Sequence, residues 1–306
     1  MISVVVPCFN EEAVMQKTYD RLKATFSSTA LIVEIIFVND GSRDRTGGII
    51  SSFTQMDRLR IVPVEFTRNF GHSAAVMAGV RASSGDMIAI IDADLQDPPE
   101  LILPMIEKIR EGFDIVYGKR VQRKAETFFK RVTAWIFYRM LRFLTDVDIP
   151  SDTGDFRVIT REVADVFKTQ IHEQDPFLRG LVAWVGYRQY PFEYSRDARV
   201  DGETKYTLRR MVRFALTGIL GFSNAPLYLG VYLSLISFVL AIASIVYLIY
   251  LKFYAFTVPG WVSTMVVISA FGAFQFLFFG ITGAYIARIN KQVTNRPIFI
   301  VRKPGT

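Results

Sequence analysis

Two aspartates, Asp92 and Asp94, follow the apolar run 87–91 and could act together on a cation. Carboxylates two residues apart at the end of a buried strand can converge on one hard metal ion. Mg²⁺ favours one or two carboxylates together with substrate phosphates, so such an ion could hold a diphosphate and stabilise it as a leaving group. The same pair is also compatible with a surface turn of helix-capping acids. Asp97, just before Pro98, suits that capping role better than a ligand role.

Further acids follow two other apolar runs. Asp40 ends the run 35–39 and is followed by Gly41, which permits a tight turn. Its carboxylate could accept a hydrogen bond from a nucleobase, or it could belong to an ordinary strand-to-helix turn. Glu11 follows the first run and could bind a ribose or a base. Neither segment is a Walker A loop or a Gly-x-Gly-x-x-Gly motif, which argues against an NTPase and a nicotinamide enzyme.

The elements that must position these acids alternate along the chain. Strands are expected at residues 2–7, 35–39, 61–66, 87–91 and 115–117. Met15, Tyr19, Leu22 and Phe26 recur at helical spacing, and 71–82 and 99–111 are further helix candidates. The alternation predicts a mostly parallel sheet covered on both sides, with ligands beyond the carboxyl ends of its strands. In this scheme Cys8 is a packing residue, and His72 begins a helix and is assigned no catalytic role from the sequence.

Composition and charge narrow the class of protein. The chain has 306 residues, a net charge of +7 and 51% hydrophobic residues, which excludes a disordered chain. One cysteine excludes an intramolecular disulfide framework and a multi-cysteine metal site, and two histidines argue against a His-rich zinc centre. Glu203 is the last acidic residue, so the whole positive excess lies in the last third. This distribution favours a membrane protein over a nucleic-acid binder.

Two long uncharged runs predict transmembrane helices near 227–251 and 261–287, joined by a short loop. A pair of buried core helices is the alternative. Basic residues flank both runs on the side away from the loop, so both termini are expected in the cytoplasm. The basic, aromatic-rich segment 119–142 could lie in the headgroup plane, or it could be a solvated helix with a core face.

Five motifs stand in one order along the chain. They are Pro7 with Asn10-Glu11-Glu12, Val38-Asn39-Asp40-Gly41-Ser42 with Asp44 and Thr46, Arg68-Asn69-Phe70-Gly71, Asp92-Ala93-Asp94-Leu95-Gln96-Asp97-Pro98, and Asp152-Thr153-Gly154-Asp155-Phe156-Arg157. Together they resemble the family 2 glycosyltransferases with a GT-A fold. Within that family the chain is similar to the polyprenyl-phosphate glycosyltransferases, relatives of dolichyl-phosphate mannose synthase, over about residues 1–225. The trailing helices resemble those of the bacterial subgroup that glucosylates undecaprenyl phosphate.

The resemblance implies a role for each matching residue. Asp92 and Asp94 would bind Mg²⁺ or Mn²⁺, and Asp155 would be the catalytic carboxylate, acting as a base or orienting the acceptor. The remaining residues would contact the nucleotide, the sugar diphosphate or the acceptor phosphate. They are Pro7, Glu11, Asp40, Gln96, Arg120, Arg179, Arg199 and Lys205.

The implied protein is an α/β GT-A domain over 1–205, a juxtamembrane helix over 206–226, two transmembrane helices within 227–287 and a cytoplasmic basic tail over 288–306. Its implied reaction is inverting transfer of glucose from UDP-glucose to undecaprenyl phosphate at a bilayer. The missing Gln-x-x-Arg-Trp motif favours a single transfer over polymer synthesis. GDP-mannose or another sugar nucleotide as donor, and a non-enzymatic membrane scaffold, are the alternatives. Residues 297–301 could pair with a neighbouring chain in a homo-oligomer.

Overall fold

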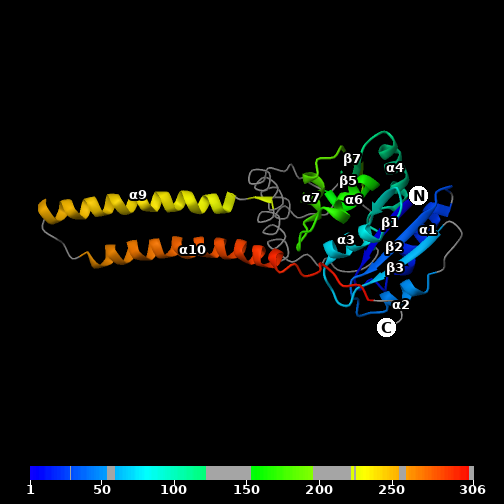
Figure 1. Cartoon of the computed structure of the whole chain (residues 1–306), viewed down its shortest axis with the longest axis horizontal. Coiled ribbons are helices and arrows are strands. Elements are labelled where there is room, and N and C mark those ends of the chain that lie inside the picture. Colours follow the sequence, from blue (N-terminus) through cyan, green and yellow to red (C-terminus); the bar gives the residue numbers. More distant parts are fainter. Residues whose placement is uncertain are drawn as a thin grey trace.

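The computed structural model describes residues 1–27, 29–53, 59–121, 153–195, 222–223, 225–254 and 260–302. A layered head is built from the first two thirds of the chain. Two long helices, α9 (Ala225–Tyr254) and α10 (Trp261–Val293), lie side by side and extend away from it (Figure 1). The head and the helix pair therefore form two distinct parts.

The head contains a sheet whose seven strands run in the order β3-β2-β1-β4-β6-β5-β7. β1, β2, β3 and β4 run parallel to one another, whereas β6 lies antiparallel between β4 and β5. β7 is parallel to β5. The strands are β1 (Ile2–Cys8), β2 (Val33–Asn39), β3 (Leu59–Glu65), β4 (Met87–Ile90), β5 (Ile115–Arg120), β6 (Thr153–Thr160) and β7 (Gln189–Tyr194).

The sheet confirms the five predicted strands and is mostly parallel, as predicted, although β6 runs against the other strands and makes the sheet mixed. β6 and β7 were not expected from the sequence. β6 alternates polar Asp155 and Arg157 with apolar Phe156 and Val158, so it lacks the continuous apolar run of the first strands. Its reversed direction brings its first residues to the carboxyl end of β4.

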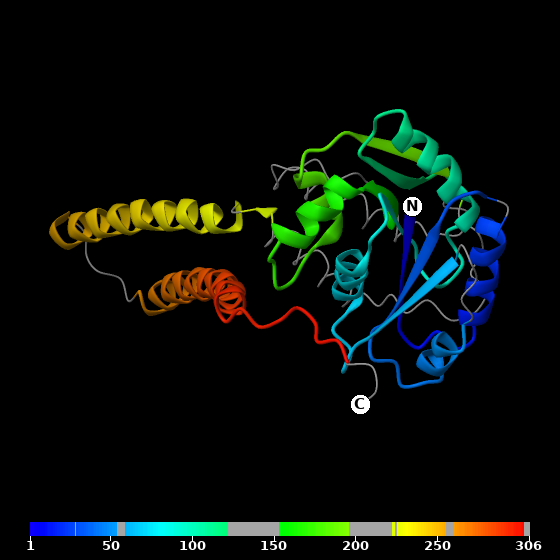
Figure 2. The same cartoon turned by 45° about the vertical axis from the view of Figure 1, so that its right-hand side comes forward.

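Helices cover both faces of the sheet (Figure 2). Alternate strand residues point to opposite faces, so Val4 and Val6 pack in one buried cluster and Val5 in the other. The first cluster includes the predicted face of α1, and the second includes α3, α6 and α7. The helices of the head are α1 (Met15–Ser27), α2 (Thr46–Ser51), α3 (His72–Ala82), α4 (Ile102–Arg110) after a 3₁₀ turn at Pro99–Leu101, α6 (Arg161–Thr169) and α7 (Leu178–Trp184).

The helix pair carries large apolar side chains that are exposed, among them Val231, Leu235 and Phe276. Within the part of the chain that the structure describes, Ala270–Val293 of α10 is long and apolar enough to cross a bilayer, with a mean hydropathy of 1.5. The apolar segment Ala225–Leu240 of α9 is shorter. The prediction of two spans is therefore not confirmed and stays a prediction.

The chain after α10 returns to the head. Thr67 N–H donates to the Ile300 carbonyl, and Val301 forms an antiparallel bridge with Phe66. The Phe299 ring stacks on Phe66, with ring centroids 5.1 Å apart. The sequence left open that residues 297–301 pair with a neighbouring chain, but here they dock at the end of the edge strand of their own head.

Candidate active site

The carboxyl ends of β1, β2 and β4 meet at one edge of the head. Asp92 and Asp94 follow β4, as predicted. Because β6 is antiparallel to β4, its third residue, Asp155, reaches the same edge. His72, the first residue of α3, enters from the helix layer. The topology thus gathers acids that are far apart in the sequence.

His72 lies between two of these acids. Its Nε2 is 3.1 Å from Oδ2 of Asp155 and 3.7 Å from Oδ1 of Asp92. Burial lowers the pKa of His72, but the hydrogen bond to Asp155 and the charges of both acids raise it to about 9. The imidazole is therefore predominantly a cation at neutral pH. From the sequence His72 was expected only at a helix start, which is confirmed, and its place in the site was not predicted.

Two arginines hold the other side of Asp155. Oδ1 is 3.4 Å from Nε of Arg179 on α7 and 3.5 Å from Nη2 of Arg157 on β6. Arg157 also donates to the Gly154 and Asp155 carbonyls. Burial raises the pKa of Asp155, but Arg179, His72 and Arg157 together hold it well below its ordinary value. Asp155 is thus an ionised carboxylate and a weak base.

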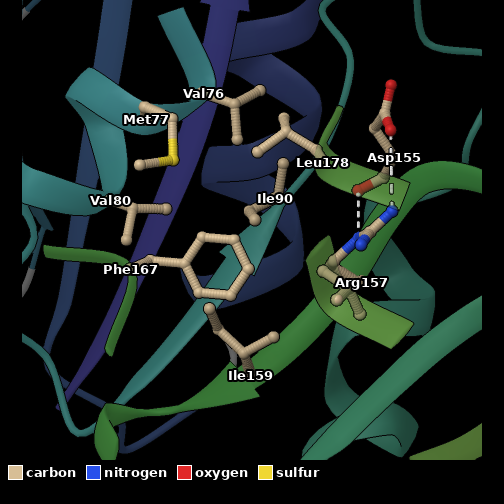
Figure 3. Close-up of a pocket in the computed structure, with 10 residues that line it drawn as sticks. Val76, Met77, Val80, Ile90, Asp155, Arg157, Ile159, Phe167 and Leu178 are labelled. Carbon is tan, nitrogen blue, oxygen red and sulfur yellow. Dashed lines mark hydrogen bonds and ion pairs between the residues drawn. The ribbon is translucent and has the colours of Figure 1, made fainter. Parts of the chain in front are cut away.

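Arg157 belongs to the fifth sequence motif, but no role was predicted for it. The residue is only 3% exposed, which is rare for an arginine unless it is paired. Figure 3 shows its guanidinium pointing to Asp155, and the apolar side chains of Met77, Ile90 and Phe167 line the same pocket. The small cavity among these side chains belongs to the packed core beneath the site. Arg157 therefore places a positive charge next to Asp155 on the core side of the site.

Asp92 has an environment opposite to that of Asp155. Burial raises its pKa, and the nearby carboxylates of Asp155, Asp97 and Asp94 raise it further, whereas His72 lowers it. A divalent cation would relieve this repulsion, so the donor set suits such an ion. No group of three or more His, Cys, Asp or Glu side chains in the described ranges is arranged to hold a metal by itself. Protein carboxylates plus substrate phosphates would have to complete the coordination.

The loop after Asp92 is strained. Leu95 has φ 57°, in the left-handed region that a leucine rarely adopts. The turn lets the Gln96 N–H donate to Oδ1 of Asp94 at 3.1 Å. Such strain typically costs about 1–3 kcal/mol and persists where the surroundings enforce it. The loop carries Asp94 and Gln96 at the same edge as Asp92, but their predicted ligand contacts remain predictions.

Asp97 does not cap the helix that follows, so that expectation is wrong. Its side chain is fully buried, and Oδ1 accepts a hydrogen bond from the Tyr194 hydroxyl at 2.5 Å. Nη2 of Arg120 lies 3.9 Å from the same oxygen. Arg120 also packs over Gly154, where a Cβ would collide with its guanidinium. Asp97 therefore helps to hold the Arg120 guanidinium beside the start of β6.

Asp40 anchors the loop that leads to His72. Its carboxylate is 2% exposed and accepts hydrogen bonds from the N–H groups of Phe70 at 2.6 Å and Gly71 at 2.9 Å. It also accepts from the Asn69 amide at 2.8 Å. Burial raises its pKa, although these bonds oppose the shift. The nucleotide contact expected of Asp40 stays a prediction, and the observed role is structural.

Glu11 and Pro7 lie at the carboxyl end of β1. Glu11 N–H donates to the Thr46 hydroxyl at 2.9 Å, which ties the loop after β1 to the loop after β2. Pro7 is a buried residue of β1, where its nitrogen faces the side of β4. Proline has no backbone N–H to donate to a neighbouring strand. Because β4 ends at Ile90, the sheet loses no hydrogen bond at Pro7. Cys8 is buried, as expected of a packing residue.

Some predicted residues lie outside the part of the chain that the structure describes. They are Arg199, Lys205 and most of the basic segment 119–142 and of the juxtamembrane segment 206–226. Asp92, Asp155, Arg179 and Arg120 are brought to one region, together with His72 and Arg157. The site thus combines clustered carboxylates with a set of cations, which suits the binding of two phosphate-bearing molecules.

The chain is similar to known glycosyltransferases. The family model described as glycosyl transferase family 2 matches residues 3–167. The chain is 46% identical over 302 residues to an "Uncharacterized glycosyltransferase YkcC" of Bacillus subtilis, covering 98% of this chain and 93% of that protein. It is 38% identical over 306 residues to a "SfII prophage-derived bactoprenol glucosyl transferase" of Shigella flexneri, covering 99% and 97%. The S. aureus TarS structure in complex with UDP-GlcNAc is similar with a TM-score of 0.48, 16% identity and coverage of 72% and 67%, too distant for an inference about ligands.

Proposed function

The chain belongs to glycosyltransferase family 2, and on that premise we propose that it transfers glucose from UDP-glucose to a polyprenyl phosphate such as undecaprenyl phosphate. The observation that carries the proposal is the meeting of Asp92, Asp155, Arg157 and Arg179 at one edge of the sheet. The name of the Shigella relative, a bactoprenol glucosyl transferase, supports the lipid acceptor and the sugar.

The donor half of the site would be the acidic loop after β4. Asp92 and Asp94 would hold Mg²⁺ or Mn²⁺, which when bound would screen the donor diphosphate and stabilise it as a leaving group. Gln96, Glu11 and Pro7 would line the sugar and nucleotide. Arg120, held by Asp97 and Tyr194, would add a cation to the phosphate region.

The acceptor half would be the cationic side of Asp155. A lipid phosphate has a second pKa of about 6, so it is largely ionised at neutral pH. Arg179 can bind it, and Arg199 and Lys205 would contribute further charge. A phosphate oxygen would attack the anomeric carbon, forming the new C–O bond as the bond to the diphosphate breaks. This single displacement inverts the anomeric configuration and releases UDP.

Asp155 would orient the acceptor and would not need to remove a proton. Its pKa is held well below the ordinary value by Arg179, His72 and Arg157, against the effect of burial. A carboxylate this stable takes up a proton poorly, and an ionised phosphate has none to give up. Asp155 is therefore proposed to fix the arginines and exclude misaligned acceptors.

The membrane part would bring the head to its acceptor. We propose that α9 and α10 both span the bilayer, with the head and both termini in the cytoplasm. The basic residues after Tyr285, among them Arg288 and Lys291, support that orientation. Arg288 and Lys291 also pair with Glu173 and Asp175 of the head, so α10 is fastened close to the α7 side of the site. A homo-oligomer is compatible with this arrangement.

The test is sugar transfer in membranes that contain the full chain and added undecaprenyl phosphate. Radiolabelled UDP-glucose, GDP-mannose and other sugar nucleotides are compared as donors. We expect lipid-linked glucose only with UDP-glucose, loss of product with EDTA and its recovery with Mg²⁺ or Mn²⁺. Transfer from GDP-mannose instead would replace the donor and keep the acceptor.

Site variants test the assignment of residues. Asp94→Ala and Asp155→Ala are expected to abolish transfer, whereas Asp20→Asn, an exposed aspartate on α1, is the control. Unchanged transfer by both site variants would refute the site. Absence of any lipid-linked sugar from the wild-type chain, with every donor, would refute the proposed function and favour a scaffold.

A further inference from the structure

We propose that His72 is a positioning residue that fixes the carboxylate of Asp155 and separates it from Asp92. The inference rests on the proposed function, since it concerns the same site. The histidine is neither in the acidic motif nor among the residues that the family resemblance matched to a role. It comes from the start of α3, a different element from β4 and β6.

The carboxylate of Asp155 is held from two opposite sides. Oδ1 faces Arg179 at 3.4 Å and Arg157 at 3.5 Å, whereas Oδ2 faces Nε2 of His72 at 3.1 Å. The arginines alone would leave Oδ2 free to rotate about the side-chain axis. With the imidazole in place, both oxygens have partners, and the plane of the carboxylate is defined.

The imidazole also stands between two negative charges. Nε2 is 3.7 Å from Oδ1 of Asp92, so the same ring atom faces both acids. Asp92 belongs to the proposed donor half and Asp155 to the acceptor half. A group with N–H between them reduces their repulsion and keeps the two halves of the site at a fixed separation.

His72 can serve this purpose because its backbone is itself fixed. The two residues before it, Phe70 and Gly71, donate their N–H groups to the buried carboxylate of Asp40. Gly71 has φ 103°, which lets the chain turn into α3 at this point. The ring therefore projects from a helix start that is tied to the end of β2.

Two substitutions of His72 distinguish a role of its N–H group in positioning Asp155 from a role of the ring's volume. His72→Ala removes the ring, whereas His72→Gln places a side-chain amide N–H near the position of Nε2. We expect His72→Ala to lower kcat about 10- to 100-fold, with KM for donor and acceptor changed less than about threefold. His72→Gln should recover a large part of kcat. Equal losses in the two variants would overturn the positioning role.

The control is His172, the other histidine of the chain. Its side chain is exposed, and its interaction with α10 uses the backbone carbonyl, which accepts from Gln292. His172→Ala should leave kcat unchanged. Metal-dependent binding of UDP, measured by calorimetry, should stay within about threefold of wild type in His72→Ala. A loss of UDP affinity as large as the loss of kcat would overturn the inference and place His72 in donor binding.

A double-mutant cycle with Asp155→Asn tests the proposed partner. If His72 acts through Asp155, the shifts in thermal unfolding of the ligand-free chain should be non-additive, with His72→Ala causing little further shift in the Asp155→Asn background. Additive shifts would overturn the inference. The unfolding cycle needs no turnover, so a wild-type chain that transfers no sugar refutes the proposed function separately.

Discussion

Replacement of Asp40 by asparagine should destabilise the head strongly. The buried carboxylate accepts three hydrogen bonds, at 2.6 and 2.9 Å from backbone N–H groups and at 2.8 Å from the Asn69 amide. Asparagine presents an NH₂ group in place of one oxygen, so at least one buried donor loses its acceptor. An orphaned buried N–H costs about 1–3 kcal/mol, and bonds to a charged acceptor are the stronger ones. We expect a loss of about 2–4 kcal/mol in the free energy of unfolding.

The measurement is the thermal unfolding of the full chain in detergent. For a domain of about 150–250 residues, 1 kcal/mol corresponds to about 2–4 °C, so Asp40→Asn should lower the apparent Tm by about 5–15 °C. Asp20→Asn is the matched control, because the Asp20 carboxylate is exposed on α1 and accepts one bond from Gln16. A Tm for Asp40→Asn within about 2 °C of that control would refute the assignment of Asp40 as the loop anchor.

The contacts of Glu34 and of Phe299 lead to two further predictions about the stability of the head. Burial raises the pKa of Glu34, but bonds from Ser3 and Ser84 bring it below its ordinary value of 4.5. The ionised Glu34 therefore stabilises the fold above that value, and this stabilisation is lost as the pH falls through the lower folded pKa. In acid, the free energy of unfolding in urea should depend less on pH for Glu34→Gln than for the wild type. Phe299→Ala removes a ring stacked on Phe66 and should lower the free energy of unfolding by about 1–3 kcal/mol. The measurement is limited proteolysis, in which the C-terminal segment should be cleaved faster than in the wild type. Unchanged cleavage would contradict the docking of residues 297–301 on the head.

The pattern of apolar residues in the sequence predicted most of the strands and helices of the head. β1 and β2 are buried on both faces, so their sequences are nearly continuous apolar runs, and the helix face of Met15, Tyr19 and Leu22 is likewise fully buried. The acids after β4 were predictable because a polar cluster that ends such a run must emerge at the edge of the sheet. Asp155 was placed only by resemblance, since its strand has no clear apolar pattern.

What the sequence could not show depends on contacts between distant elements. β6 reads Thr-Gly-Asp-Phe-Arg-Val-Ile-Thr, and nothing in that segment sets its direction or its place between β4 and β5. The position of His72 beside Asp155 follows from that reversal. Asp97 looked like a capping residue because a proline follows it, yet its partner, Tyr194, is 97 residues away. One available signal was that His72 follows a glycine in a motif just after a predicted strand.

The charge around Asp155 also restricts the acceptor. An acceptor hydroxyl would need a base to take its proton, and Asp155 is a poor one because Arg179, His72 and Arg157 outweigh the effect of burial on its pKa. A phosphate oxygen is already ionised, and its charge is attracted by the same cations. The chain should therefore glycosylate a polyprenyl phosphate and leave the corresponding polyprenol unmodified, measured by thin-layer separation of labelled lipids from parallel reactions. Comparable rates with the two lipids would mean that a base is active in the site, and the orienting role of Asp155 would have to be abandoned.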